Sequence, residues 1–201
     1  MSENQQSYYD QIPDGLPKTH HTLVTRLARF LFRAFGWKFA GEIPDLKKAV
    51  VTIAPHTSNI DFLILVLAKL SLDLKASYIM KKEAFFWPFK NLFIRIGGIP
   101  IDRSQPSRIV SQVTKQIRNH DRIWLVITPE GTRKKVQKYK SGFVRMAHAA
   151  KVPIIVVGFD YPNKTIHFAG SRQPTGDHEA DTLELQNFYR NTFVGKHPKN
   201  Q

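Results

Sequence analysis

The sequence predicts an α/β domain with a mostly parallel central sheet flanked by helices, preceded by an amphipathic helix near the N-terminus. Short runs that are apolar at every position are typical of strands buried on both faces, as in a parallel sheet. Segments with helical periodicity separate these runs along the chain. The chain has 201 residues, 42% of them hydrophobic, which is enough for one compact core. No repeat or linker divides residues 41–201, so we expect them to form a single domain.

Two segments precede this domain. Residues 1–21 mix Gln, Asp, Pro and Gly without periodicity, which predicts a flexible tail. Residues 22–40 open with helical periodicity and are predicted to form a basic amphipathic helix. Its faces are apolar and basic, with Leu23, Leu27, Phe30, Leu31, Ala34 and Phe35 on one side and Thr22, Thr25, Arg26, Arg29 and Arg33 on the other.

No acidic residue lies on the basic face of this helix. Such a helix can bury its apolar face between the headgroups of an anionic membrane. Alternatively, it is an ordinary surface helix that packs its apolar face on the core of the domain. We expect the membrane role, with an anionic membrane surface as a partner and peripheral attachment on the cytoplasmic side.

Strands and helices alternate from residue 49 onward, which is typical of a parallel sheet with crossover helices. The predicted strands are residues 49–54, 75–79, 99–101, 123–128, 153–159 and 165–168. The predicted helices are residues 60–70, 86–96, 106–119, 141–150 and 181–192. An aromatic cluster at Phe85, Phe86, Trp87, Phe89 and Phe93 is compatible with an acyl-chain groove, a membrane contact or plain core.

Composition and charge restrict the classes of function. Thirty Lys and Arg against 16 Asp and Glu give a net charge of +14, and residues 71–150 hold 16 of the basic and 5 of the acidic residues. This charge attracts anionic partners, whether nucleic acid, lipid surface or phosphorylated small molecules. The absence of cysteine excludes disulfides, thiolate metal sites and a cysteine nucleophile, and it suits a reducing compartment. The longest apolar run, Phe62 to Ala68, is too short for a transmembrane helix.

Parallel sheets place their sites at the carboxyl ends of strands, so the segments that follow strands are the candidates. His56 lies just after the strand 49–54, and Asp61 lies about one turn into the next helix. A histidine there can act as a general base while the carboxylate holds its other ring nitrogen. The alternative is a turn histidine beside a carboxylate that caps a helix.

Two further segments follow strands. Gly97 and Gly98 lead into a short strand that ends at Asp102-Arg103, which is compatible with an anion site or with a tight turn and a surface ion pair. The segment from Pro129 to Arg133 follows the strand 123–128 and offers a glycine for close approach and an arginine for a phosphate. Its alternative is a solvated basic loop, because further lysines follow, namely Lys134, Lys135, Lys138 and Lys140.

These segments together carry a resemblance to a known family. His56 to Asp61 resembles an H-x4-D motif, Gly98 to Arg103 resembles a G-x-x-x-[DR]-R block, and Pro129 to Arg133 matches a P-E-G-T-R block. The segment from Val152 to Val157 is similar to a fourth, apolar block. In this order and at these intervals, the blocks resemble the glycerolipid acyltransferase family, which includes the bacterial 1-acylglycerol-3-phosphate acyltransferases. The chain departs from the pattern at Pro100, Thr128 and Lys134, and its fourth block lacks a second proline at Val156-Val157-Gly158.

The resemblance implies the family's α/β fold and the transfer of an acyl chain from acyl-CoA or acyl carrier protein to a lysophospholipid hydroxyl. Lysophosphatidic acid is the default acceptor, and it would give phosphatidic acid. The resemblance implies no cofactor, because the acyl thioester is a substrate. By the same resemblance, His56 deprotonates the acceptor and Asp61 orients His56. Arg103 and Arg133 contact the acceptor's phosphate, and Glu130, Gly131 and Thr132 shape that pocket.

Other interpretations stay open. One is an acyltransferase for another lysolipid acceptor. Another is a basic protein that binds nucleic acid or anionic lipid without catalysis; we expect no nucleic acid partner, because the chain has no recognised nucleic-acid-binding motif. A third is a metal-dependent hydrolase that uses His56 and Asp61 as ligands. We expect no metal site, since two ligands are too few and the remaining histidines lack metal-binding spacing.

Overall fold

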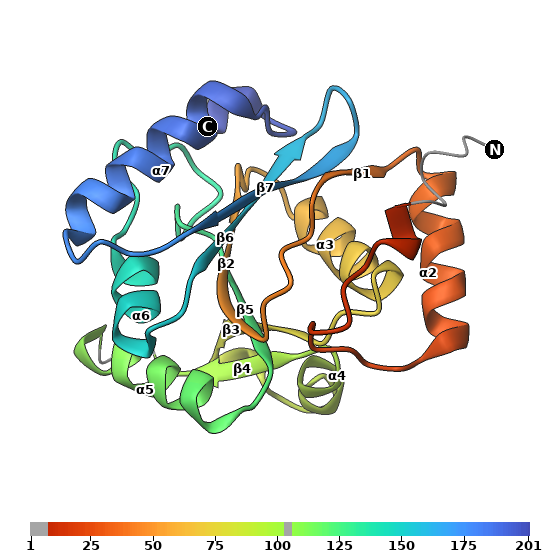
Figure 1. Cartoon of the computed structure of the whole chain (residues 1–201), viewed down its shortest axis with the longest axis horizontal. Coiled ribbons are helices and arrows are strands. Elements are labelled where there is room, and N and C mark those ends of the chain that lie inside the picture. Colours follow the sequence, from red (N-terminus) through yellow and green to blue (C-terminus); the bar gives the residue numbers. More distant parts are fainter. Residues whose placement is uncertain (1–7, 103–105) are drawn as a thin grey trace.

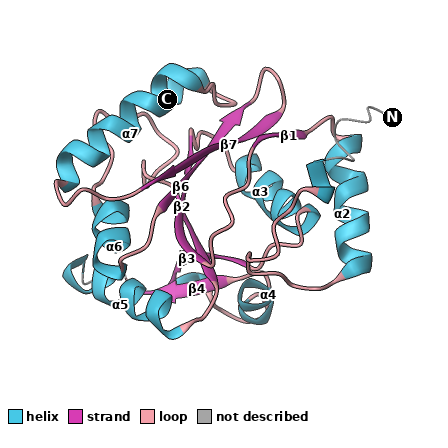
Figure 2. Ribbon diagram, in the orientation of Figure 1, coloured by secondary structure: helices cyan, strands magenta, loops and turns pink. Residues whose placement is uncertain are grey.

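The computed structural model describes residues 8–102 and 106–201, apart from the side chains at positions 81, 84, 106 and 107, and it confirms the mixed α/β class. Its sheet has seven strands in the order β1-β7-β6-β2-β5-β3-β4 (Figures 1 and 2). Neighbouring strands are parallel, except that β6 and β7 are antiparallel. The strands are β1 (Lys38–Gly41), β2 (Lys48–Ala54), β3 (Ala76–Lys81), β4 (Gly98–Ile101), β5 (Ile123–Ile127), β6 (Ile154–Asp160) and β7 (Thr165–Arg172).

Helices cover both faces of the sheet. They are α2 (Thr22–Ala34), α3 (Ile60–Ser71), α4 (Lys90–Arg95), α5 (Pro106–Asn119), α6 (Gly142–Ala150) and α7 (His178–Thr192), with short 3-10 turns η1 (Lys82–Ala84) and η2 (Pro198–Asn200). Figure 1 shows α2, α3 and α4 on one side of the sheet and α5, α6 and α7 on the other. Right-handed crossovers explain this, because the chain moves toward β4 through α3 and α4 and returns through α5 and α6.

The central strand β2 positions the site. Residues 49–54 are all buried, because helices cover both faces of the sheet at this strand. Val51 belongs to the apolar core on the side of α2 and α3, and Val50 belongs to the core on the side of α5, α6 and α7. The strand lies between β5 and β6, with Thr52 opposite Ile127 and Val156. Three parallel strands therefore end at the same edge, directly before the loops that carry the candidate residues.

The strands and helices from residue 48 onward lie close to their predicted ranges, and the N-terminal segments differ more. Residues 8–21 are not a flexible tail, because Leu16 is fully buried and the chain is tied to the domain by backbone hydrogen bonds. Lys75 N–H donates to the carbonyl of Pro17 at 2.8 Å, and Thr19 N–H donates to that of Asp73 at 3.0 Å. This segment holds too few periodic apolar residues for its packing to be visible in the sequence.

The predicted helix over 22–40 is shorter than expected. It ends at Ala34 because Gly36 adopts a positive φ of 78°, a backbone conformation that suits glycine and terminates helices. Residues 38–41 instead form β1, which pairs in parallel with β7. The helix predicted over 86–96 is likewise reduced to α4, which covers residues 90–95.

Helix α2 packs on α3 through the face opposite to its exposed apolar side chains. Thr25, Ala28 and Phe32 are the buried residues of this helix. Leu23 and Phe30 are 81% and 68% exposed. The helix is thus a surface helix, yet its apolar face points away from the core. No helix of the described ranges has both the length and the apolar character needed to cross a membrane.

Candidate active site

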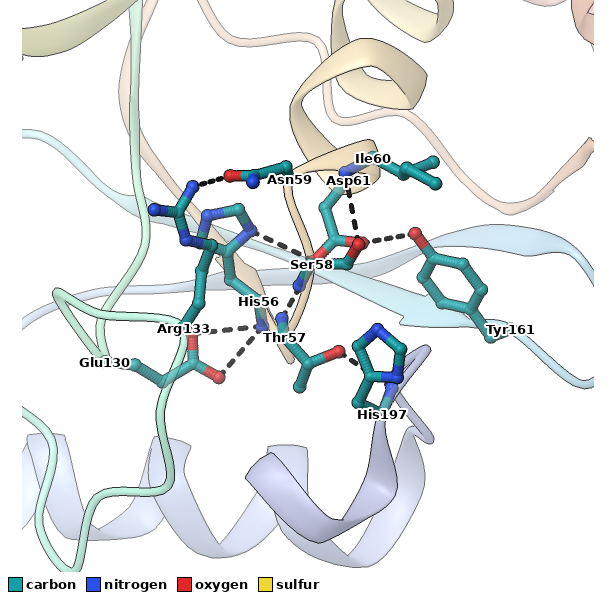
Figure 3. A network of polar contacts seen from close by, with 10 residues as sticks. All are labelled: His56, Thr57, Ser58, Asn59, Ile60, Asp61, Glu130, Arg133, Tyr161 and His197. Carbon is teal, nitrogen blue, oxygen red and sulfur yellow. Dashed lines mark hydrogen bonds and ion pairs between the residues drawn. The ribbon is translucent and has the colours of Figure 1, made fainter.

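The turn after β2 brings His56 and Asp61 together, as their spacing predicts (Figure 3). His56 Nδ1 lies 3.1 Å from Asp61 Oδ2. Asp61 is in the first turn of α3 and its side chain is fully buried, whereas the His56 side chain is 16% exposed. Since Nδ1 faces the carboxylate, Nε2 is the ring nitrogen that can meet a substrate. This arrangement suits a general base held in one orientation.

The carboxylate of Asp61 accepts hydrogen bonds at both oxygens. Oδ2 also accepts from the backbone N–H groups of Thr57 at 2.8 Å and Ser58 at 2.9 Å, and Oδ1 accepts from the hydroxyl of Tyr161. Burial alone would raise the pKa of Asp61, but the hydrogen bonds from His56, Tyr161 and the Ser58 N–H outweigh it and hold the pKa below its ordinary value. Asp61 is therefore charged at neutral pH and can stabilise a protonated His56.

Tyr161 is a site residue that the sequence reading missed. It follows β6 directly, and Ala54 at the end of β2 pairs with Gly158 in β6. The two strand ends are therefore neighbours, which brings the phenol to Asp61. The ring packs edge-on against Trp37, with centroids 5.1 Å apart. The rule that sites follow parallel strands, applied to the strand predicted over 153–159, could have found this tyrosine.

Glu130 supports the backbone of the turn that joins β2 to α3, residues 55–59, which we name the catalytic turn for its candidate base His56. Its two carboxylate oxygens lie 3.0 and 3.1 Å from the backbone nitrogen of His56, whose N–H they share. The side chain is buried. Burial raises the pKa of Glu130 to about 7, against the opposing effect of the His56 N–H. Glu130 thus lies beneath the turn and fixes the backbone of His56, which determines where the imidazole can lie.

Residues 131–133 are exposed beside this turn, whereas Pro129 is buried like Glu130. Gly131 has a φ of 65°, which favours glycine at this position. The guanidinium of Arg133 donates a hydrogen bond to the side-chain oxygen of Asn59, a residue between His56 and Asp61 in sequence (Figure 3). Thr132 Oγ1 accepts from the backbone N–H of Lys134 at 3.3 Å. Arg133 is thus placed at the N-terminus of α3, close to the catalytic pair.

The second predicted block is described only in part. Arg103 lies outside the described residues. Its neighbour Asp102 accepts from Lys82 Nζ at 2.6 Å. Lys82 and Asp102 form an ion pair at the surface. It joins the end of β4 to the turn after β3, because β3 and β4 are neighbouring parallel strands.

The C-terminal segment also reaches the catalytic turn. The backbone N–H of His197 donates to Thr57 Oγ1 at 3.1 Å. A Cβ built on Gly195 would lie 2.9 Å from the Thr57 side chain, so the backbone approaches the turn closely. No sequence pattern pointed to these residues. Within residues 8–102 and 106–201, no group of three or more His, Cys, Asp and Glu side chains is placed to hold a metal ion.

Comparisons with known proteins show which family and fold this chain resembles. A family model described as "Acyltransferase" matches residues 20–160. A relative from Mycoplasma pneumoniae, named "Probable 1-acyl-sn-glycerol-3-phosphate acyltransferase", is 32% identical over 159 residues. That match covers 73% of this chain and 59% of the relative, so the chain spans less than two thirds of the relative's length. The solved structure of the 1-acyl-sn-glycerophosphate (LPA) acyltransferase PlsC from Thermotoga maritima matches with a TM-score of 0.62 over 95% of this chain and 81% of that one. Its sequence identity is 16%, so it shows the same fold.

Proposed function

The chain belongs to the acyltransferase family, and on that premise we propose that it transfers a fatty acyl group from an acyl thioester to the hydroxyl of a lysophospholipid. Lysophosphatidic acid is the proposed acceptor, which gives phosphatidic acid as the product. The observation that carries the proposal is the His56–Asp61 pair, with a buried carboxylate on Nδ1 and a partly exposed imidazole. The name of the Mycoplasma relative supports the choice of acceptor.

The proposed reaction is a direct transfer. Nε2 of His56 takes the proton of the acceptor hydroxyl while the hydroxyl oxygen forms a bond to the thioester carbonyl carbon. The tetrahedral intermediate then collapses, the carbon–sulfur bond breaks, and the leaving thiolate takes the proton back from His56. Asp61 keeps the imidazole in one tautomer and stabilises its positive charge between these two steps. The chain has no cysteine, so no acyl-cysteine intermediate can form on it.

Arginines are the proposed contacts for the acceptor's phosphate. Arg133 lies beside the N-terminus of α3, where helix geometry also favours an anion. A guanidinium can bind two phosphate oxygens at once, which fixes the acceptor's position as well as its charge. Arg103 is proposed for the same role by the match of its motif alone. Gly131 and Thr132 are exposed between Arg133 and the buried Glu130, and they are the proposed boundary of the phosphate site.

The proposed donor is acyl-CoA or an acylated carrier protein, and no cofactor takes part. The proposed location is the cytoplasmic surface of a membrane, to which the chain attaches peripherally. Helix α2 supports this location, because its apolar side chains Leu23, Leu27 and Phe30 are exposed and only arginines flank them as charged residues. Nucleic acid is not a proposed partner.

Thiol release tests the reaction. The chain is mixed with a panel of acyl-CoAs and, separately, acylated carrier protein, with and without lysophosphatidic acid in anionic vesicles. We expect release that depends on the acceptor and that falls by about 10²- to 10⁴-fold in His56→Ala, the range typical of a lost general base. His120→Ala is the matched control, since His120 is an exposed histidine at the C-terminal end of α5. Absence of release with every donor and with a panel of lysolipids would contradict the proposal.

A further inference from the structure

Exposed apolar side chains are concentrated on one face of the molecule. Among the described residues, fourteen large hydrophobic side chains are exposed, and twelve of them come from α2, α3, the segment 86–94 and their ends. These three helices, α2, α3 and α4, lie on the same side of the sheet (Figure 1). The other two, Leu183 and Val194, come from α7 and the segment after it. A monomeric protein in water rarely gathers so much apolar surface on one face without a partner for it.

The segment 86–94 is the most prominent part of this surface. Trp87 is 88% exposed, Phe86 57% and Phe89 45%, so plain core, one of the three alternatives for this cluster, does not apply to these three side chains. Their burial would require a partner that the domain itself does not supply. Two exposed apolar side chains of α4, Leu92 and Ile94, extend the same surface.

Aromatic contacts within the segment keep it compact. The Phe86 ring packs edge-on against Phe89 at 5.5 Å, and Phe85 packs against Phe93 at 6.0 Å. The segment is also fixed to α3, because Lys69 Nζ donates to the carbonyl of Ile96 at 2.5 Å and to that of Ala76 at 2.9 Å. The aromatic side chains are therefore presented on a supported structure.

Helix α3 connects this surface to the chemistry. Asp61 points inward from the first turn of α3, whereas Ile60 and Leu63 of the same turn are 42% and 65% exposed. The apolar surface thus extends to the turn that carries the catalytic carboxylate. A lipid layer that covered this surface would therefore bring its lipids next to His56.

The charges around the segment identify the partner. Lys82, Lys90 and Arg95 flank the aromatic side chains, and Glu83 is the acidic residue among them. Arginines likewise flank the apolar stripe of α2. Apolar side chains bordered by cations suit an anionic bilayer, in which the rings enter the interface and the cations meet the headgroups.

We propose that residues 86–94 form a second membrane contact, separate from α2, which inserts Phe86, Trp87 and Phe89 into the interface of an anionic bilayer. With contacts on both sides of α3, the bilayer lies across the helix turn that carries Asp61. The proposed function explains why such a contact is useful, because the acceptor is then a lipid of the same bilayer. The inference rests on the proposed function in this respect alone. Membrane binding itself needs no turnover, so the two can fail independently.

Trp87 provides a direct test. The chain has three tryptophans, and the other two, Trp37 and Trp124, are 7% and 1% exposed. Tryptophan emission is measured with vesicles of phosphatidylcholine and phosphatidylglycerol, with and without bromine on the acyl chains. We expect a blue shift on binding and strong quenching by the brominated lipid, both absent in Trp87→Phe. Full binding of the native chain without quenching would overturn the proposal.

Charge substitutions test whether the contact contributes affinity. We expect Trp87→Glu and, in α2, Leu27→Glu each to weaken binding to these vesicles by about tenfold or more, because a carboxylate must enter the interface. Leu183→Glu is the matched control, since Leu183 is 52% exposed on α7, on the opposite side of the sheet, and it should bind like the native chain. Circular dichroism checks that each variant is folded.

Two results separate the alternatives. If Trp87→Glu binds vesicles normally but changes a native dimer to a monomer in sedimentation, a second copy of the chain covers the segment and the proposal is wrong. If the native chain binds and Trp87 is quenched while no donor or lysolipid gives acyl transfer, the membrane contact stands and the proposed function fails.

Discussion

Tyr161 donates its hydroxyl hydrogen bond to Oδ1 of Asp61, the carboxylate oxygen that His56 does not contact. The two oxygens of one carboxylate are thus held by different parts of the fold. The phenol comes from the end of β6, and the imidazole comes from the end of β2. Tyr161 is therefore a positioning residue, which acts on the chemistry through Asp61.

Tyr161→Phe removes this hydrogen bond and keeps the ring that packs on Trp37. We expect kcat for acyl transfer to fall by about tenfold, as for a lost hydrogen bond to a charged group, with little change in the KM for lysolipid. The pKa of Asp61 should rise, because one group that lowers it is gone. Tyr78→Phe is the control, since the Tyr78 hydroxyl has no hydrogen-bond partner among the described residues, and an equal effect there would contradict the role of Tyr161.

Glu130→Gln tests the buried carboxyl group beneath His56. The pKa of Glu130 is raised from 4.5 to about 7 in the folded protein, so the folded state keeps a proton that the unfolded state releases between these values. The native chain should therefore lose about 2 to 4 kcal/mol of unfolding free energy relative to Glu130→Gln as pH rises from 4.5 to above 7. Urea unfolding at several pH values measures this difference. Glu184→Gln is the control for removing one carboxylate, because Glu184 is exposed on α7.

Arg133→Ala tests the proposed phosphate contact. The variant should raise the KM for lysophosphatidic acid by roughly tenfold and leave kcat within about twofold, because it removes binding that is equal in the ground and transition states. Lys134→Ala changes the next exposed cation and should have little effect. Losing Arg133 removes both its hydrogen bond to Asn59 and its positive charge. Asn59→Ala separates these two effects, since it breaks the hydrogen bond and leaves the guanidinium in place. A normal KM in Arg133→Ala would exclude the contact.

Gly158→Ala tests the packing behind the site. A Cβ at this position of β6 would lie 2.3 Å from the ring of Phe193, which follows α7. We expect the variant to lose about 1 to 3 kcal/mol of unfolding free energy, the usual cost of overpacking a core. The double variant with Phe193→Leu should recover part of that loss, because the smaller side chain leaves room. Thermal unfolding of both variants and of Phe193→Leu alone gives the three values needed.

The periodic elements and the first half of the site could be predicted from the sequence. The run of apolar residues in β2 and the turn that follows it are short-range features of the sequence, so the sequence predicts the positions of His56 and Asp61. The alternation of strands and helices likewise gave the α/β class. Residues 8–21 and β1 could not be predicted, since their order depends on contacts with distant parts of the chain and not on their own pattern.

Most contacts that support the site were beyond the sequence for the same reason. Asn59 and His197 are separated from their partners by loops and strand order, which one sequence does not specify, whereas Tyr161 at least follows a predicted strand. The sequence also does not show where the positive charge of residues 71–150 lies in space. Part of it lines a groove of about 700 Å³ between α5 and α6, on the other side of the sheet from α3 (Figure 1), with Lys115, Arg118 and Arg145 among its residues.

The catalytic turn depends on contacts that span most of the chain. Glu130 meets His56 across 74 positions, Tyr161 meets Asp61 across 100, and His197 meets Thr57 across 140. Contacts between distant positions close large loops, so they form late when a chain folds. A chain still in synthesis has the residues of the H-x4-D motif before the groups that hold them, and a chain cut before His197 lacks the last of these groups. Recovery of activity during refolding should therefore coincide with completion of the whole domain, and the enzyme's own turnover can serve as the marker of its last folding step.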